Sequence, residues 1–387
     1  MSRKLSEPGL RISYADSIEE IQPEDWNRLA AETSPFLKHE FLLALEATGC
    51  TTRESGWQPH HVKVHDLQGA LVGVVPLYRK TNSYGEYVFD WSWADAYRSN
   101  GLAYYPKFLT AIPFTPSECS RFLLDPKLSS AATIRRIADS VMEHAEDLEM
   151  SSWHVLFPTE EENQCLQSDQ LMSREGCQFH WFNRGYRDFD DFLAALSSRK
   201  RKNIRKERQS VFSQGIRFQV VRGGDISETQ WKHFFVFYQS TYLVRGMQGY
   251  LNQEFFMRIG QTMPDNLFLV LAKLGDQIIA GALFFQDDKK LFGRYWGSLE
   301  EFQFLHFETC FYQGIEYCIQ QGLSRFDAGA QGEHKIQRGF EPVRTFSNHW
   351  LRHPSFAAAI GEFLQREKDY MREYRQQAKE LLPFRKS

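Results

Sequence analysis

The second half of the chain contains short apolar segments separated by turns, a pattern typical of β-strands. Residues 267–273 and 277–286 are apolar and rich in β-branched and aromatic side chains, so each is predicted to form a strand. Asp287 and Asp288 separate the second of these from another apolar segment, residues 291–298. We therefore expect a strand followed by a hairpin.

A helix is predicted to follow the hairpin. Apolar side chains recur every three or four residues between residues 307 and 321, and Gly322 supplies a C-terminal cap. Residues 324–328 and 345–351 are then expected as strands, and a long amphipathic helix is expected after Pro354. The order strand, hairpin, helix, strand is that of an α/β acyltransferase-like sheet.

Three short segments of the first half resemble three segments of the second half, and they occur in the same order. Agreement of three segments in one order predicts duplication of a whole α/β domain rather than a short solenoid repeat. The paired segments are 36–41 with 250–255, 70–75 with 278–283, and Gly176 to Trp181 with Gly339 to Trp350.

The domain boundary is expected near residue 188, where an acidic segment is followed by a strongly basic one. We predict a first domain over residues 1–188 and a second over residues 189–353 that opens with a basic helix. Residues 354–387 are expected to form a C-terminal amphipathic helix that packs on the domains.

Composition and charge exclude several classes of protein. Of the 387 residues, 42% are hydrophobic and 25% are charged, which argues against long disordered segments. The net charge of −3 excludes a polycation, so nucleic-acid binding would need a local basic patch. The apolar runs are far shorter than the ~20 residues that span a bilayer, and we expect no membrane span, signal peptide or anchor. The six cysteines include no Cys-x-x-Cys pair, which favours free thiols in the cytoplasm and no metal site.

The richest candidate site directly follows the predicted strand at 324–328. Residues 327–338 combine an acid, a histidine, a lysine and an arginine with small residues that let the backbone approach a ligand closely. In α/β sheets such sites lie at the carboxyl ends of strands. The alternative is a solvated surface turn.

Two nearby segments could contribute to the same site. Arg294 lies on a predicted strand rich in aromatic residues and needs either an anion or water, so an exposed strand face is the alternative. Glu308 and Glu316 share one face of the predicted helix, where a carboxylate with a pKa raised by burial could act as a general base. The alternative there is a solvated helix face, and His306, just before the helix, could be structural or catalytic.

Two further segments carry unusual chemistry. Seven of the ten residues from 199 to 208 are cationic, which indicates phosphate contact with tRNA, CoA or a lipid pyrophosphate, or else a solubilising helix. Residues 76–95 are aromatic and acidic and could form a pocket for a cationic acceptor, or an aromatic core with exposed carboxylates. Kinase, dehydrogenase, zinc-protease and serine-hydrolase motifs are missing from the sequence.

Nine segments spread along nearly the whole chain carry a resemblance to a known family: 34–41, 85–91, 104–107, 113–116, 178–181, 200–205, 293–297, 305–308 and 329–335. In these segments the chain resembles the FemAB-like family of predicted N-acyltransferases, which are tandem GNAT-fold proteins often labelled as peptidoglycan-biosynthesis related. The resemblance implies an α/β fold of two tandem GNAT-like domains, each with a sheet splayed to admit a donor's pantetheine or acyl arm.

The resemblance leaves the donor open. GNAT enzymes hold acetyl-CoA with a glycine-rich loop that opens the central helix, but the corresponding residues 300–306 contain no glycine and two acids. This departure disfavours acetyl-CoA and favours aminoacyl-tRNA or a carrier-protein thioester, because backbone amides could not cradle a pyrophosphate there in the usual way.

Two hypotheses follow. The first is an N-acyltransferase that moves an acyl or aminoacyl group from aminoacyl-tRNA, acyl-CoA or a carrier-protein thioester to an amine acceptor, with a cell-wall precursor as one candidate. No tightly bound cofactor is expected. The second is a non-catalytic module that holds a peptide or nucleic acid in a groove between the domains.

The first hypothesis assigns roles to three groups of residues. The residues expected to act in catalysis are Glu308, Glu333, His334, Lys335 and His306. Those expected to bind the donor phosphates are Lys200, Arg201, Lys202, Arg205 and Arg338. Those expected to contact substrate are Arg294, Tyr295, Trp296, Gln331, Glu316, Tyr84, Glu86, Asp90 and Trp91.

Overall fold

The computed structural model describes residues 9–30, 34–330 and 332–385, and these form two compact units. The N-terminal unit comprises residues 1–176 and 345–368, and the C-terminal unit comprises residues 177–344 and 369–387. The chain passes from one unit to the other within two strands and within the last helix. The predicted division, at 188/189 and 353/354, treated each domain as continuous, whereas each unit is assembled from separate segments of the chain.

The N-terminal unit contains two sheets. The first has the strand order β1-β3-β4-β7 and is antiparallel throughout. In the second, β2, β5 and β6 are antiparallel neighbours, β6 is parallel to β8, and β8 is antiparallel to β15. The strands of the whole N-terminal unit are β1 (Arg11–Ala15), β2 (Trp57–Pro59), β3 (His61–His65), β4 (Leu71–Val75), β5 (Tyr78–Lys80), β6 (Lys107–Thr110), β7 (Leu123–Leu124) and β8 (Ser152–Leu156), with part of β15 (Glu341–Leu351). Its helices are α1 (Pro23–Ala30), α2 (His39–Ala47), α3 (Trp91–Ser99), α4 (Ala131–Asp147) and α5 (Glu160–Leu166), with the first part of α12 (Pro354–Glu380).

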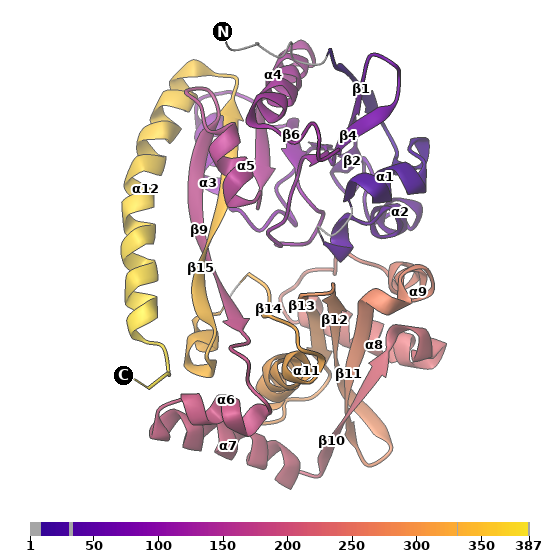
Figure 1. Cartoon of the computed structure of the whole chain (residues 1–387), viewed down its shortest axis with the longest axis vertical. Coiled ribbons are helices and arrows are strands. Elements are labelled where there is room, and N and C mark those ends of the chain that lie inside the picture. Colours follow the sequence, from indigo (N-terminus) through magenta and orange to yellow (C-terminus); the bar gives the residue numbers. More distant parts are fainter. Residues whose placement is uncertain (1–8, 31–33, 331, 386–387) are drawn as a thin grey trace. The chain divides into compact units, whose positions relative to one another are not determined.

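The C-terminal unit has one sheet with the strand order β10-β11-β12-β13-β14-β9 (Figure 1). Its strands are β10 (Ile216–Arg222), β11 (Leu267–Leu274), β12 (Gln277–Gln286), β13 (Lys290–Ser298) and β14 (Arg325–Asp327), with part of β9 (Met172–Phe182). Its helices are α6 (Phe189–Ala195), α7 (Ser198–Ser213), α8 (Glu228–Leu243), α9 (Gln253–Thr262), α10 (Leu305–Phe307) and α11 (Gln313–Gln321), with the last part of α12. A 3-10 turn, η6 (Glu333–Arg338), follows β14.

The two units repeat one order of elements, as the sequence predicted. Each runs through a strand, two helices, further strands, a long helical segment, and then a strand that is parallel to an earlier strand of the same unit: β8 to β6, and β14 to β13. The sequence-similar segments occupy equivalent places: His39 begins α2 where Gln253 begins α9, and Gly73 lies in β4 where Gly281 lies in β12.

The last strand of each repeat is exchanged between the halves of the sequence. In the C-terminal unit, β14 pairs with residues 180–182 of β9, which belong to the first half of the sequence. In the N-terminal unit, β8 pairs with residues 347–351 of β15, which belong to the second half. This exchange is the reason why neither unit is a continuous stretch of chain.

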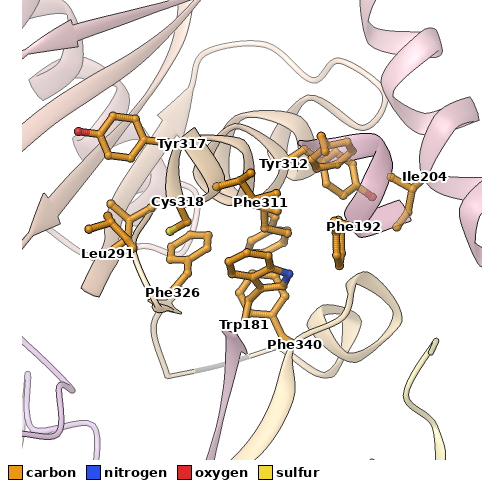
Figure 2. Packing of buried hydrophobic residues seen from close by; sticks show 14 of the residues in the cluster. Trp181, Phe192, Ile204, Leu291, Phe311, Tyr312, Tyr317, Cys318, Phe326 and Phe340 are labelled. Atoms are coloured by element: carbon orange, nitrogen blue, oxygen red, sulfur yellow. The ribbon is translucent and has the colours of Figure 1, made fainter. Parts of the chain in front are cut away.

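The core of the C-terminal unit lies between the sheet and the central helical segment, which consists of α10, α11 and the turn between them. Figure 2 shows Phe311 and Cys318 of this helical segment on the same side as Trp181, Phe326 and Phe340. The rings of Phe311 and Phe340 are 5.5 Å apart and those of Phe326 and Phe340 are 5.4 Å apart. The apolar stripe predicted for the helix therefore faces the core.

The predicted helix over residues 307–321 is interrupted. A π-helical turn, Glu308–Tyr312, separates α10 from α11, and Gly322 ends α11 with a left-handed φ of 69°, as expected for its cap. The last predicted strand is also longer than expected, because β15 already begins at Glu341. Among the described residues, none of the helices is both long and apolar enough to cross a bilayer.

We predict that Gly297→Ala destabilises the fold. A Cβ atom at Gly297 of β13 would lie 1.8 Å from the carbonyl oxygen of Phe237, because the backbone of α8 packs directly against the strand. Urea denaturation should show a loss of about 1–3 kcal/mol, as is usual for overpacking. Gly224→Ala is the control, since its nearest neighbour would be the Cβ of Pro264 at 3.9 Å, and it should change stability by less than about 0.5 kcal/mol. Equal effects of the two substitutions would contradict this account of the packing.

Candidate active site

A cavity opens where two parallel strands of the C-terminal unit separate. β13 and β14 pair from Lys290 with Arg325 to Phe292 with Asp327. Directly beyond the last pair, residues 293–296 of β13 and Ala328 after β14 line a cavity of about 170 Å³. The carboxyl ends of parallel strands are a common place for sites in α/β sheets.

A buried ion pair lies at the point of separation. The guanidinium of Arg294 donates to the Asp327 carboxylate over 2.6 and 3.2 Å, and both side chains are nearly inaccessible to solvent. Burial alone would raise the pKa of Asp327, but the charge of Arg294 and its hydrogen bonds outweigh this and hold the pKa well below its usual range. Asp327 is therefore ionised and committed to Arg294.

His180 of β9 supports this pair from the neighbouring strand. It lies opposite Asp327 in the strand pairing, and its Nε2 is 3.6 Å from a carboxylate oxygen of Asp327. Arg325 Nε donates to His180 Nδ1 over 2.6 Å, so the ring proton is on Nε2, which faces Gln178 Oε1 at 3.1 Å. Burial lowers the pKa of His180 to about 3, which fits a neutral ring.

The other wall of the cavity carries two histidines and a lysine. His306 of α10, together with His334 and Lys335 of η6, lines the cavity, and the two imidazole centroids are 6.0 Å apart. Burial, with the neighbouring cationic groups, lowers the pKa of His306 to about 4 and also lowers that of His334. Burial lowers the pKa of Lys335 to about 8, and its Nζ donates to the Gly329 carbonyl over 2.6 Å.

The arrangement offers two kinds of chemistry in one small space. The neutral imidazoles of His306 and His334 can accept a proton at neutral pH. The ammonium of Lys335 and the guanidinium of Arg294 are cations that favour developing negative charge on an oxygen. When an amine attacks a carbonyl carbon, the nitrogen loses a proton and the oxygen gains negative charge. A proton acceptor and a cation that lie side by side suit this reaction.

A family model described as peptidoglycan biosynthesis/recognition matches residues 17–386 of the chain. The chain belongs to the FemAB-like family. This membership supports an acyltransferase-type role in peptidoglycan-related processes. No curated protein sequence matches the chain.

Solved structures with the same fold cover nearly the whole FemAB-like chain. The crystal structure of FemX is similar with a TM-score of 0.55 and 14% identity over 89% of this chain and 98% of that one. The C-terminal domain of a putative lysylphosphatidylglycerol synthetase from Agrobacterium fabrum gives a TM-score of 0.53 and 8% identity, covering 90% of this chain and 96% of that one. L-PGS from Bacillus licheniformis gives a TM-score of 0.51 and 11% identity, covering 89% of this chain and 97% of that one. The fold is that of two tandem GNAT-like domains, as the sequence indicated.

The structure brings together some of the expected site residues and separates others. Of those expected in catalysis or substrate contact, the cavity is lined by Arg294, Tyr295, Trp296, His306, His334 and Lys335. Gln331 lies outside the described residues. Cys310 also lines the cavity and was not anticipated, because a single thiol within a helical stripe gives no signal in the sequence.

The carboxylates expected to act as a base have other partners in this FemAB-like chain. Glu308 is fully buried and bonded to Arg208 of α7 over 2.9 Å and to Gln313 over 2.8 Å. Arg208 also binds Glu316 over 2.8 Å. Glu333 is exposed and accepts a hydrogen bond of 2.8 Å from Tyr374. The three carboxylates are absent from the lining of the described cavity, which leaves the two histidines as the groups placed to accept a proton.

The residues expected to bind donor phosphates form two groups. Lys202 and Arg205 are exposed on α7, Arg201 is half-buried, and Arg205 binds Asp190 over 2.8 Å. Lys200 and Arg338 instead bind within the unit. Lys200 donates to Gln337 of η6.

Arg338 is committed to holding η6 in place. Its guanidinium is buried, binds Glu207 of α7 through two bonds of 2.9 Å, and donates to the His334 carbonyl over 2.9 Å. It also donates to the Tyr312 hydroxyl over 3.0 Å. Arg338 therefore positions the turn that carries His334 and Lys335, which is a different role from the one expected.

The candidates from the first half lie in the N-terminal unit, where the expected cation pocket is filled by the chain's own lysine. Lys107 is buried and bonded to Glu86 over 2.9 Å and to Asp90 by a shorter contact. Burial, together with nearby Asp90, outweighs the attraction of Lys107 and raises the pKa of Glu86 to about 7. Tyr84 and Trp91 are exposed, with their rings 5.2 Å apart.

The equivalent place in the N-terminal unit holds a buried arginine. There β6 and β8 pair up to Thr110 and Val155. Beyond them the fully buried Arg121 donates to the carbonyls of Leu156, Cys119 and Ser117 over 2.7–3.0 Å. The cavity of the C-terminal unit is therefore the better candidate for an active site.

We predict that the His306 imidazole stays neutral well below neutral pH. Its pKa of about 4 in the folded protein lies below the ordinary value of 6.5. The unfolded chain therefore binds more protons between these values, and stability is lost as the pH falls through this window. Histidine Cε1–H chemical shifts in an NMR titration should show no His306 midpoint above about pH 5, with the resonance assigned by its loss in His306→Gln. A midpoint near pH 6.5 would contradict the burial described for this ring.

Proposed function

We propose that the chain is an N-acyltransferase whose reaction takes place in the cavity of the C-terminal unit. The observation that carries the proposal is the meeting of neutral imidazoles with the cations of Lys335 and Arg294 at the point where β13 and β14 separate. The cavity is small, which suits the reactive end of a donor rather than a whole donor molecule.

The proposed reaction is the attack of an amine on an activated acyl group. The acceptor reacts as its free amine, whose nitrogen bonds to the acyl carbon, and an imidazole of His306 or His334 accepts the proton that this nitrogen then loses. The carbonyl oxygen gains negative charge, which the Lys335 ammonium stabilises. As the amide forms, the bond to the leaving sulfur or oxygen breaks, and that atom takes a proton from the imidazolium.

The donor is proposed to carry phosphates that contact the exposed face of α7. Arg199, Lys202 and Lys206 are exposed on this helix, and Arg338 of η6 binds Glu207 of the same helix. A donor held by α7 would thus lie against the helix that contacts η6, the turn that carries His334 and Lys335. Aminoacyl-tRNA, acyl-CoA and a carrier protein with its phosphopantetheine arm all carry phosphates, and an amine of a cell-wall precursor is the proposed acceptor class.

We predict that one histidine of the cavity is required for turnover but not for donor binding. Binding is first measured by native mass spectrometry with acetyl-CoA, longer acyl-CoAs and aminoacyl-tRNA, and turnover is then followed as amine-dependent loss of the acyl group from the donor that binds. His306→Gln or His334→Gln should lower kcat by about 10²–10⁴-fold, the usual range for loss of a general base, with donor affinity kept within about threefold.

His233→Gln is the matched control, because His233 is an exposed histidine of α8 that does not line the cavity. It should leave kcat within about twofold. Full turnover in both cavity variants would remove the proposed base. Binding of a donor without any amine-dependent transfer in the wild-type chain would favour the non-catalytic binding module.

A further inference from the structure

A second cavity, of about 510 Å³, lies in the N-terminal unit and has no part in the reaction proposed above. Its volume is in the range of sites for small molecules. Three stretches of chain form it: the end of α3 with the residues that follow, the connection from α4 to β8, and the end of β15 with the start of α12. Its lining residues are Tyr97, Leu102, Ala103, Tyr105, Pro106, Glu149, Ser151, Arg352, His353 and Pro354.

One side of this cavity is apolar and held in place by its surroundings. Tyr97 is 2% exposed, and its ring centroid is 4.0 Å from that of Phe356. The Tyr105 hydroxyl bonds Ser83 Oγ over 2.7 Å, and Ser83 in turn accepts from buried Lys107. Two fixed aromatic rings with Leu102 beside them form a surface for an aromatic or branched aliphatic group.

The cavity also has polar groups without partners. Among the residues that the structure describes, the buried Tyr97 hydroxyl and the Nδ1 atom of His353 have no hydrogen-bond partner. Both atoms are themselves buried, so a ligand in the cavity would contact the two side chains and not these atoms. These two side chains belong to different elements and both line the cavity.

The rim carries two opposite charges that are only loosely paired. The Arg352 guanidinium and the Glu149 carboxylate are 3.8 Å apart, and their side chains are 44% and 83% exposed. Pro354 begins the 27-residue helix α12, whose first turn contains no acidic residue, so its amide end adds partial positive charge on the side of Arg352. A simple anion would be repelled by Glu149 and a simple cation by Arg352, whereas a ligand with both charges complements both.

We propose that this cavity binds a free α-amino acid with an aromatic or branched aliphatic side chain. The α-carboxylate bonds Arg352 at the start of α12, and the α-ammonium bonds Glu149. The side chain lies against Tyr97, Tyr105 and Leu102. The proposal is independent of the transfer reaction, because no residue of the cavity between β13 and β14 takes part in it.

The test uses the full chain and ligand-detected NMR with calorimetry. L-phenylalanine and L-leucine should bind saturably. N-acetyl-L-phenylalanine, which lacks the ammonium, and L-phenylalaninamide, which lacks the carboxylate, should each bind at least about tenfold more weakly, since each loses a charged hydrogen bond.

Two variants test whether Arg352 binds the α-carboxylate of the amino acid and Glu149 its α-ammonium. Arg352→Gln should remove the preference for L-phenylalanine over its amide, and Glu149→Gln should remove the preference over the N-acetyl derivative. Arg98→Gln is the control, because this exposed arginine on the same α3 helix as Tyr97 binds Asp95 and does not line the cavity. The proposal is overturned if neither amino acid binds saturably, or if binding persists with the same selectivity in both variants.

Discussion

The buried pair of Arg294 and Asp327 is the interaction on which the candidate site depends. It joins Asp327, the last paired residue of β14, to Arg294, which lies on β13 two residues beyond the last pair, where the cavity begins. Removing one member of such a pair would leave an uncompensated buried charge, at a typical cost of about 3–5 kcal/mol. His180 of the neighbouring strand β9 lies beside Asp327 and is held by Arg325 of β14, so four side chains from three strands meet at the opening of the sheet.

The electrostatics of the cavity follow from burial next to fixed cations. Lys335 and Arg338 act on both imidazoles, and their charges together with burial keep the rings unprotonated at neutral pH. At the equivalent place in the N-terminal unit, the buried Arg121 donates to the Leu156 carbonyl at the end of β8 and to the Ser117 carbonyl. The two repeats therefore differ at this place: the C-terminal unit has a cavity lined by ionisable side chains, and the N-terminal unit has a buried arginine.

The strands and helices could be predicted from the sequence because their signals are local. Gln277–Gln286 is bounded by turn residues on both sides and was predicted with its observed bounds, and the two repeats could be aligned from short segments. The partners of charged side chains could not be predicted, because they come from distant parts of the chain. Glu308 pairs with Arg208, one hundred residues earlier, and Lys107 fills the expected acidic pocket. The exchange of β9 and β15 between the halves also leaves no local signal, since each strand looks the same whichever sheet it joins.

The central claim is that the reactive end of an acyl donor lies in the cavity between β13 and β14. The most direct measurement is a crystal structure with an unreactive analogue of whichever donor binds, in which the transferable carbonyl is kept but the scissile bond cannot break. The account predicts that the carbonyl oxygen lies within hydrogen-bonding distance of Lys335 Nζ or the Arg294 guanidinium, with the acyl carbon facing His306 and His334. An ordered analogue whose acyl group lies outside this cavity would contradict it.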